Sequence, residues 1–228
     1  MERHFHEQLQ ELKKKLTTMS RSVEESIEKS IRSFMLRDAG LADEVFRMDD
    51  VINRMEMDID DDCLKLLALQ QPLAADLRFI MAAMKINNDL ERMGDHSVNI
   101  AGYAKSLIGT EAVPPINRIP AMAKIALGMV SESLAAFVEG DADRARLVCL
   151  KDDEVDAMDD AIFKEVLRLP HPGPESVSRS LALVLASKNI ERIADLSTNI
   201  AEEVIFIVQA RTIKHHSELS VIEDRRAR

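Results

Sequence analysis

The sequence is poor in the residues that shape sheets and tight turns. It has no tryptophan, aromatic residues make up 4% of the chain, and glycine and proline number only seven each among 228 residues. Methionine, by contrast, occurs twelve times. Few turn residues and many flexible aliphatic side chains suit long helices packed against one another. The composition therefore predicts an all-α protein, long enough for one large domain or two modest ones.

Cysteines are also few, and long apolar runs are missing. Cys63 and Cys149 lie far apart and form no CxxC pair, which argues against a disulfide framework and favours a reduced compartment. No apolar stretch approaches the roughly 18 residues that a membrane-spanning helix needs. Residues 1–6 lack the apolar core of a signal peptide. We therefore expect a soluble, cytoplasmic protein.

Positive charge is scarce as well. The chain has 30 Lys and Arg against 40 Asp and Glu, which gives a formal net charge of −10. A nucleic-acid-binding protein needs a concentrated basic surface to neutralise phosphates. The charge balance therefore argues against nucleic acid as a partner and favours cations or basic proteins.

What the sequence does contain is an internal repeat. Residues 89–101 (DLERMGDHSVNIA) return 100 residues later as residues 189–201 (NIERIADLSTNIA), with seven of thirteen positions identical. A repeat of this kind indicates one supersecondary unit that is used twice.

Apolar residues recur every three or four positions through six segments, which is the period of amphipathic helices. Gly40, Pro72, Gly140 and Pro170 separate the segments within each half. The expected helices span residues 5–37, 41–70, 73–107, 121–139, 142–169 and 175–212. We therefore predict two antiparallel three-helix bundles. The first is expected over residues 1–108, followed by a linker over 109–119, the second bundle over 120–213 and a polar tail over 214–228.

Within each copy of the repeat, acidic and amide side chains recur every four residues, as Glu91, Asp95 and Asn99 do in the first copy. On a helix this spacing places the three within about 80° of arc, on a face separate from the apolar one. Two acids four residues apart repel each other, so the repeated spacing needs a reason. A shared cation is the simplest one, with a solvated helix face as the alternative. Asn99 and Asn199 are interpreted as hydrogen-bonding across helices and are left out of the ligand set.

The second predicted helix of each half carries a matching stripe. The stripes consist of Asp49, Asn53, Glu56 and Asp60 in the first half and of Asp152, Asp156 and Asp159 in the second. If the striped helices are neighbours, their oxygens can bind a hard or borderline cation. No His or Cys lies on the stripes, which argues against a tetrahedral zinc site. The predicted metal ligands are Asp49, Asn53, Glu91 and Asp95 in the first bundle and Asp152, Asp156, Glu191 and Asp195 in the second.

Three segments carry a family resemblance. They are QPLAADLR at residues 71–78, ERMGD at 91–95 and ERIAD at 191–195. Together with the order of six helices, they resemble the PhoU family of phosphate-uptake regulators over nearly the whole chain. The resemblance implies two three-helix bundles whose acidic E/D-x-x-x-D motifs hold multinuclear iron or other metal clusters on the bundle surface. Asn53 departs from that motif because an amide replaces the second carboxylate, so we expect weaker metal binding in the first bundle.

The resemblance also implies a function. Proteins of this family couple a phosphate-specific ABC transporter to a membrane sensor histidine kinase and keep the phosphate-starvation response off when phosphate is plentiful. By resemblance we expect a non-enzymatic negative regulator of phosphate homeostasis, homodimeric and in contact with the membrane only through its partners. Iron is the expected metal, with manganese, magnesium or zinc as alternatives.

Other function classes stay open from the sequence. An accessory role to a different, ion-driven phosphate transporter is the closest, and a non-regulatory metal-binding helical protein is another. A ferritin-type di-iron oxidase needs Glu-x-x-His pairs, which the sequence does not contain. The turn residues between the helices argue against a long structural coiled coil. The lack of a recognisable nucleophile, base or glycine-rich phosphate loop favours a protein that is not an enzyme.

Overall fold

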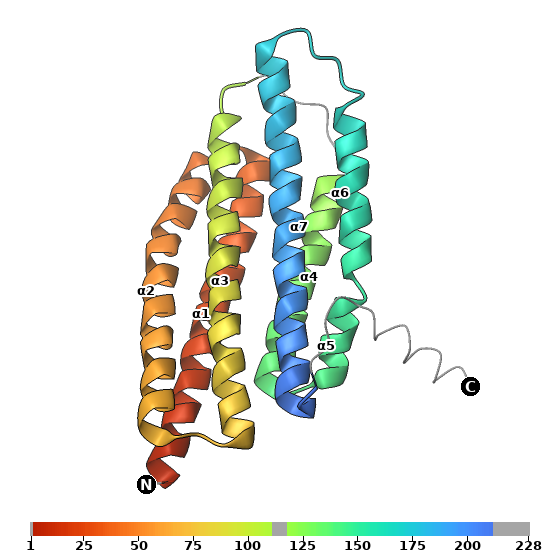
Figure 1. Ribbon diagram of the computed structural model, residues 1–228. Helices are drawn as coiled ribbons and strands as arrows, with labels where there is room; N and C mark the ends of the chain where they lie inside the picture. Colours follow the sequence, from red (N-terminus) through yellow and green to blue (C-terminus); the bar gives the residue numbers. More distant parts are fainter. Residues whose placement is uncertain (1, 111–117, 212–228) are drawn as a thin grey trace, which may run out of the picture.

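The structure, a computed structural model, describes residues 2–110 and 118–211, and within these ranges every regular element is an α-helix (Figure 1). The helices are α1 (Glu2–Leu36), α2 (Ala39–Gln70), α3 (Ala74–Ser106), α4 (Arg118–Glu139), α5 (Ala142–Cys149), α6 (Asp152–Val166) and α7 (Pro174–Gln209). The predicted all-α class is confirmed. Most of the predicted linker and all of the predicted tail lie outside the described residues, and the exact domain boundaries stay predictions.

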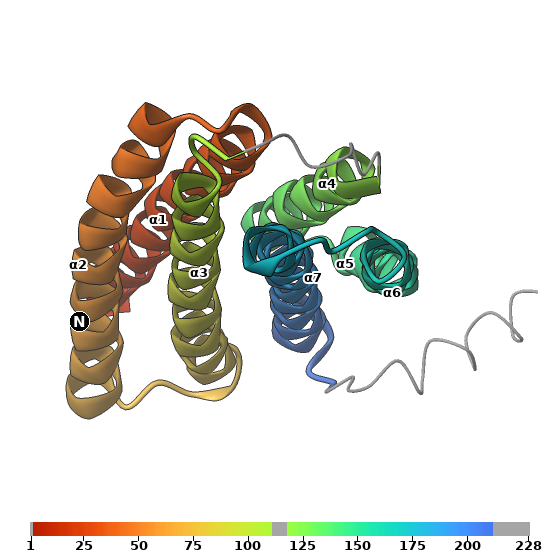
Figure 2. The same cartoon turned by 90° about the horizontal axis from the view of Figure 1, so that it is seen from above.

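The helices form two bundles that lie side by side. α1, α2 and α3 contact one another, while α7 contacts α4, α5 and α6. Contacts between α3 and α7, and between α1 and α4, join the two bundles. Figure 2 shows α3 and α7 at the centre, α2 and α6 on opposite sides, and α1 and α4 together on one face. The two copies of the repeat, in α3 and α7, therefore lie next to each other.

The apolar stripe of α1 shows why this segment is a core helix. Leu12, Leu16, Met19, Val23 and Ile27 recur every three or four residues and are at most 1% exposed. This spacing places all five on the face of α1 that packs against α2 and α3. The periodicity that predicted the helix is thus the periodicity of its buried face.

An aspartate begins the second helix of each bundle. Oδ1 of Asp38 accepts hydrogen bonds from the backbone N–H groups two and three residues further on, at 2.8 and 3.1 Å. Oδ1 of Asp141 does the same for α5, with both distances 2.9 Å. These N-caps satisfy backbone donors that have no partner within the helix. The two bundles therefore share their turn chemistry as well as their core pattern.

The predicted fifth helix, over residues 142–169, differs from the structure because it is interrupted. α5 ends at Cys149 and α6 begins at Asp152, with Leu150 and Lys151 between them. Three acidic residues occupy the first turn of α6, where the positive end of the helix dipole stabilises carboxylates. The acidic run therefore favours a new helix start over continuation of α5.

α4 comes closer to a membrane-spanning composition than we expected from the sequence. It contains an 18-residue window with a mean hydropathy of 1.5, which passes the test for a span by length and composition alone. Half of that window is buried inside the protein. Met122 and Met129 are fully buried, and α4 packs against α1, α5, α6 and α7. Its apolar character is accounted for by this position in the core.

Both cysteines are buried free thiols. Cys63 lies in α2 and Cys149 at the end of α5, and no disulfide joins them. Burial raises the pKa of each thiol to about 12. Both side chains are therefore neutral near pH 7 and act as small apolar core residues.

Candidate metal centre

The eight predicted ligands fall into two groups, each at the contact between two helices of one bundle. The first acidic cluster lies on α2 and α3 and consists of Asp49, Asn53, Glu91 and Asp95. The second acidic cluster lies on α6 and α7 and consists of Asp152, Asp156, Glu191 and Asp195. Since α3 and α7 are the two central helices (Figure 2), the clusters flank the contact between the bundles.

In the first acidic cluster, an amide holds one of the carboxylates. Nδ2 of Asn53 donates a 3.2 Å hydrogen bond to Oδ2 of Asp49. The other side-chain oxygen of each residue, Oδ1, is buried and accepts no hydrogen bond from any described residue. The backbone of α3 approaches here, because a Cβ atom on Gly94 would lie 3.8 Å from Oδ1 of Asp49. Two buried oxygens of α2 thus have no donor among the described residues, and that of Asp49 lies close to α3.

Burial and mutual repulsion disfavour the ionised form of the first acidic cluster. The pKa of Asp49 is raised, first by burial and then by the nearby charge of Asp95. The pKa of Glu91 is raised by the same two causes in the same order. A cation bound among these groups would stabilise their ionised forms. The electrostatics of the first acidic cluster therefore suit a positively charged ligand.

In the second acidic cluster, three carboxylates from two helices converge. One oxygen each from Asp156, Glu191 and Asp195 lie within 4.8 Å of one another. Two oxygens on opposite sides of one cation are at most twice the metal–oxygen distance apart, which is about 4.2 Å for Mg²⁺ and about 5 Å for Ca²⁺. Within the described part of the chain, no other group of three acidic, histidine or cysteine side chains meets this separation. The arrangement therefore suits a single cation held between α6 and α7.

Glu191 is the most enclosed of the three converging acids. Its side chain is only 10% exposed. Its Oε2 atom is buried and accepts no hydrogen bond from any described residue, although Nε of Arg192 lies 3.7 Å away. Burial raises the pKa of Glu191, which the hydrogen bond from Lys188 partly offsets. A buried carboxylate oxygen without a donor is a group that a metal ion would satisfy.

Asp152 is placed differently from its predicted role as an equal fourth ligand. It is the first residue of α6 and is nearly buried, but it is not one of the three converging acids. The negative charge of Asp152 still acts on the three converging acids, because the pKa of Asp195 is raised first by burial and next by Asp152. The structure thus brings together three of the four predicted residues and leaves Asp152 as a charged neighbour.

Two cationic side chains lie at the second acidic cluster, and one of them, Lys188, was missed in the sequence analysis. Nζ of Lys188 lies 2.7 Å from Oε1 of Glu191 and 3.6 Å from Oδ2 of Asp159. Nη1 of Arg192 lies 3.2 Å from Oδ2 of Asp195. Within α7, both contacts join residues three apart in the sequence, and residues three apart on a helix are neighbours, so the spacing could have predicted them. The second acidic cluster is therefore partly neutralised by its own helix.

Comparison with known proteins identifies the architecture. A family model described as the PhoU domain matches residues 16–104 and again residues 119–204. A Clostridium acetobutylicum protein named phosphate-specific transport system accessory protein PhoU homolog is 33% identical over 92% of this chain and 96% of its own length. A Pseudomonas aeruginosa protein of the same name is 34% identical over 92% of this chain and 88% of its own.

Solved structures agree with the sequence matches. The crystal structure of PhoU from Pseudomonas aeruginosa superposes with a TM-score of 0.87 at 34% identity, covering 91% of this chain and all of that one. The phosphate transport system regulatory protein PhoU from Streptococcus pneumoniae gives a TM-score of 0.85 at 28% identity, covering 92% and 100%. The likeness therefore extends over both bundles.

Proposed function

This chain belongs to the PhoU family, and we propose that it is a regulatory accessory protein of a phosphate transport system. Its role is to couple a phosphate ABC transporter to a membrane sensor histidine kinase and to keep the phosphate-starvation response off when phosphate is plentiful. The observation that carries this proposal is the family match over both bundles, with relatives named for phosphate transport. The protein acts in the cytoplasm, as a homodimer, and reaches the membrane only through these partners.

We further propose that both acidic clusters bind metal ions. The convergence of Asp156, Glu191 and Asp195 across two helices carries this part of the proposal. The donors are all oxygens, which suits iron, manganese or magnesium better than zinc. A bound ion supplies positive charge that neutralises the clustered carboxylates and ties α6 to α7. Metal loading would in this way set the charge and rigidity of the helix pair α6 and α7 that a partner meets.

The regulatory proposal is tested by deleting the gene and following a reporter of phosphate-starvation genes in phosphate-rich medium. We expect the reporter to stay on in the deletion strain and to be switched off again by the intact gene. Normal repression in the deletion strain would contradict the proposal. An accessory role to an ion-driven phosphate transporter is separated from it by the partner: co-purification would then recover that permease and not the ABC transporter.

The metal proposal is tested by elemental analysis of protein purified without chelator. A matched variant with Glu91→Gln, Asp95→Asn, Glu191→Gln and Asp195→Asn keeps the shape of both clusters while removing four charges. We expect bound metal in the unmodified protein and its loss in the variant, with unchanged helical content. Equal metal contents in the two proteins would show that the metal is bound elsewhere or nonspecifically.

A further inference from the structure

The ammonium group of Lys188 occupies a place in the second acidic cluster that a metal ion could also take. Its Nζ atom lies 2.7 Å from Oε1 of Glu191, an acid that is 8% exposed and whose Oε2 has no hydrogen-bond donor among the described residues. The same Nζ lies 3.6 Å from Oδ2 of Asp159. Lys188 thus bridges α7 to α6, as a metal ion between the two helices would.

Among the described residues of the first bundle, no lysine forms an ion pair with the first acidic cluster. Asn88 stands at the position that corresponds to Lys188, because the repeat is offset by 100 residues. Arg92, which corresponds to Arg192, lies 3.8 Å from Asp89, an acid outside the first acidic cluster. The two clusters therefore differ in their own cations as well as in their carboxylates.

From this asymmetry we propose that Lys188 is a tethered counter-ion of the second acidic cluster, which a metal ion must displace from Glu191. The inference rests on the proposed metal binding and adds its regulation. The ammonium group lies 2.7 Å from Oε1, while Oε2 of the same carboxylate is the oxygen left for a metal ion. Two positive charges held on one largely buried carboxylate repel each other. Metal binding and the Lys188–Glu191 contact therefore compete.

Asp159 provides the place to which the displaced ammonium moves. Its Oδ1 atom accepts a 2.7 Å hydrogen bond from Oγ of Ser187, which fixes the carboxylate beside Lys188. Its Oδ2 atom is already 3.6 Å from Nζ. The Lys188 side chain is 45% exposed, so the flexible stem can turn from Glu191 to Asp159 without disturbing the core. The counter-ion thus has two resting positions, one at each acid.

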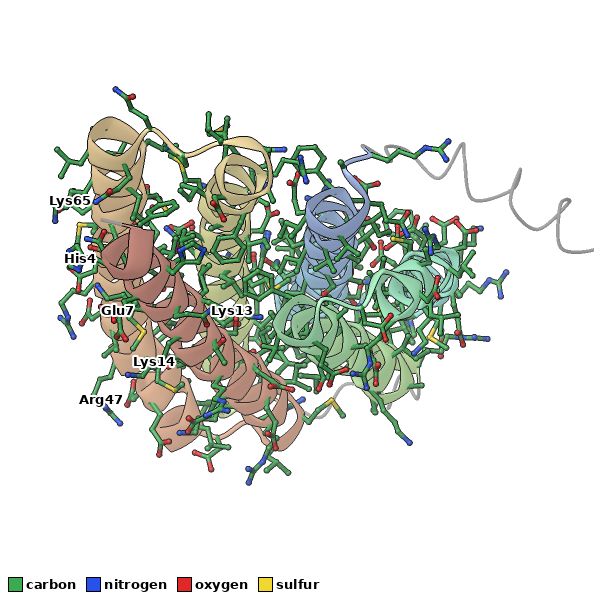
Figure 3. All side chains as sticks on the ribbon, turned by 90° about the horizontal axis from the view of Figure 1, so that it is seen from below. His4, Glu7, Lys13, Lys14, Arg47 and Lys65 are labelled. Carbon is green, nitrogen blue, oxygen red and sulfur yellow. The ribbon has the colours of Figure 1, made fainter. Side chains whose placement is uncertain are left out.

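The competition is measured with Mn²⁺ as the probe in a Glu91→Gln/Asp95→Asn background, which leaves the second acidic cluster as the binding site. Lys188→Asn, which places the residue of the first repeat in the second, removes the counter-ion. Lys65→Asn removes the same charge from α2, on the side of the molecule away from α6 and α7 (Figure 3). Lys65 is exposed and lies 3.9 Å from Asp61, so it is the matched control.

We expect Lys188→Asn to lower the dissociation constant for Mn²⁺ by about three- to tenfold, because it removes one positive charge whose repulsion of the metal ion is partly screened by solvent. Lys65→Asn should leave the constant unchanged. An unchanged constant in Lys188→Asn, when the background protein does bind Mn²⁺, overturns the role of Lys188 alone. Absence of Mn²⁺ binding in all of these proteins overturns the metal proposal itself and this inference with it.

The reciprocal exchange gives a second readout. Asn88→Lys, in a Glu191→Gln/Asp195→Asn background, introduces a counter-ion beside the first acidic cluster and should weaken Mn²⁺ binding there. In the unmodified protein, adding Mn²⁺ should change the rate at which an amine reagent labels Lys188, measured by peptide mass spectrometry, while the rate for Lys65 stays constant. A rate for Lys188 that does not respond to saturating Mn²⁺ would show that the metal leaves the contact with Glu191 in place.

Discussion

The side chain of Asn99 donates a 3.2 Å hydrogen bond to Oδ1 of Asn189 across the contact between α3 and α7. The same oxygen lies 2.8 Å from Nδ1 of His96, and Nδ2 of Asn189 donates to the backbone carbonyl of Leu185 at 2.7 Å. The interpretation of Asn99 as a cross-helix residue is therefore confirmed. Asn189 thus accepts polar contacts from two residues of α3 at the contact that joins the two bundles.

We expect Asn189→Ala to destabilise the protein by about 0.5–1.5 kcal/mol, because it removes the acceptor shared by the exposed Asn99 and the half-buried His96. Urea unfolding measures the loss. Asn99→Ala alone should cost less, because it removes one donor and leaves His96 in place. A double-mutant cycle between Asn99 and Asn189 should show coupling of about 0.5 kcal/mol or more. Strict additivity would mean that the hydrogen bond contributes nothing of its own.

The repeat-related contact on the same seam joins Asp89 and Asn199. Asp89 occupies the place of Asn189, and burial raises its pKa to about 6. The folded protein therefore binds a proton at Asp89 more readily than the unfolded chain does. The stability that this proton contributes is fully present at low pH and is lost as the pH rises from about 4 through about 6.

We expect Asp89→Asn, which copies the second repeat, to raise the free energy of unfolding at pH 8 by on the order of 2 kcal/mol. An asparagine keeps a hydrogen-bonding partner for Asn199 and removes the buried charge. At pH 4 the gain should nearly disappear, because Asp89 is then protonated in the folded state. Urea unfolding at the two pH values checks this. A gain of equal size at both would show that burial of the charge is not its cause.

The sequence predicted the architecture well because two independent signals agreed. The repeat indicated two copies of one unit, and the period of apolar residues in segments such as Leu12–Ile27 showed which face each helix buries. The interruption at Leu150 and Lys151 was not predicted, since no glycine or proline stands there. A run of acids that favours a helix start is a weaker signal than a residue that breaks one.

The sequence predicted which site residues share a face of one helix, but it predicted less well which residues of two helices meet. Glu191 and Asp195 had to share a face because they are four residues apart. Whether Asp152 or Asp156 meets them depends on the rotation and start of α6, and that start lies at the unpredicted interruption. Lys188, which forms an ion pair with Glu191, was overlooked.

Gly94 offers a test of how closely α2 and α3 approach at the first acidic cluster. A Cβ atom there would lie 3.4 Å from Cγ2 and 3.5 Å from Cδ1 of Ile52, which is ordinary van der Waals contact. The second repeat carries a fully buried Ala194 at this position. We expect Gly94→Ala to stabilise the protein by about 0.5–1 kcal/mol through helix propensity. Gly94→Leu should destabilise it, because a larger side chain has no room beside Ile52 and Asp49. Thermal unfolding of both variants measures the two effects.

The two clusters should hold metal unequally. The second offers four carboxylates, three of which already converge, while the first offers three carboxylates and the neutral amide of Asn53. Affinity of oxygen-ligand sites rises with ligand charge, so the second should bind more tightly. Lys188 reduces this difference without removing it, because its ammonium can move to Asp159.

The comparison is between Glu191→Gln/Asp195→Asn and Glu91→Gln/Asp95→Asn, with metal per chain measured after dialysis against a weak chelator. The content should fall more in the former pair. Its metal-free form should stay folded with equal or higher stability, because burial raises the pKa of both Glu191 and Asp195 and neutral amides avoid that penalty. Equal losses in the two variants, or no metal in the unmodified protein, would refute the asymmetry. A larger loss of metal in Glu91→Gln/Asp95→Asn would mean that Lys188 and Arg192 outweigh the extra carboxylate. The positively charged side chains at each cluster, rather than the number of acids, would then decide which cluster binds metal more tightly.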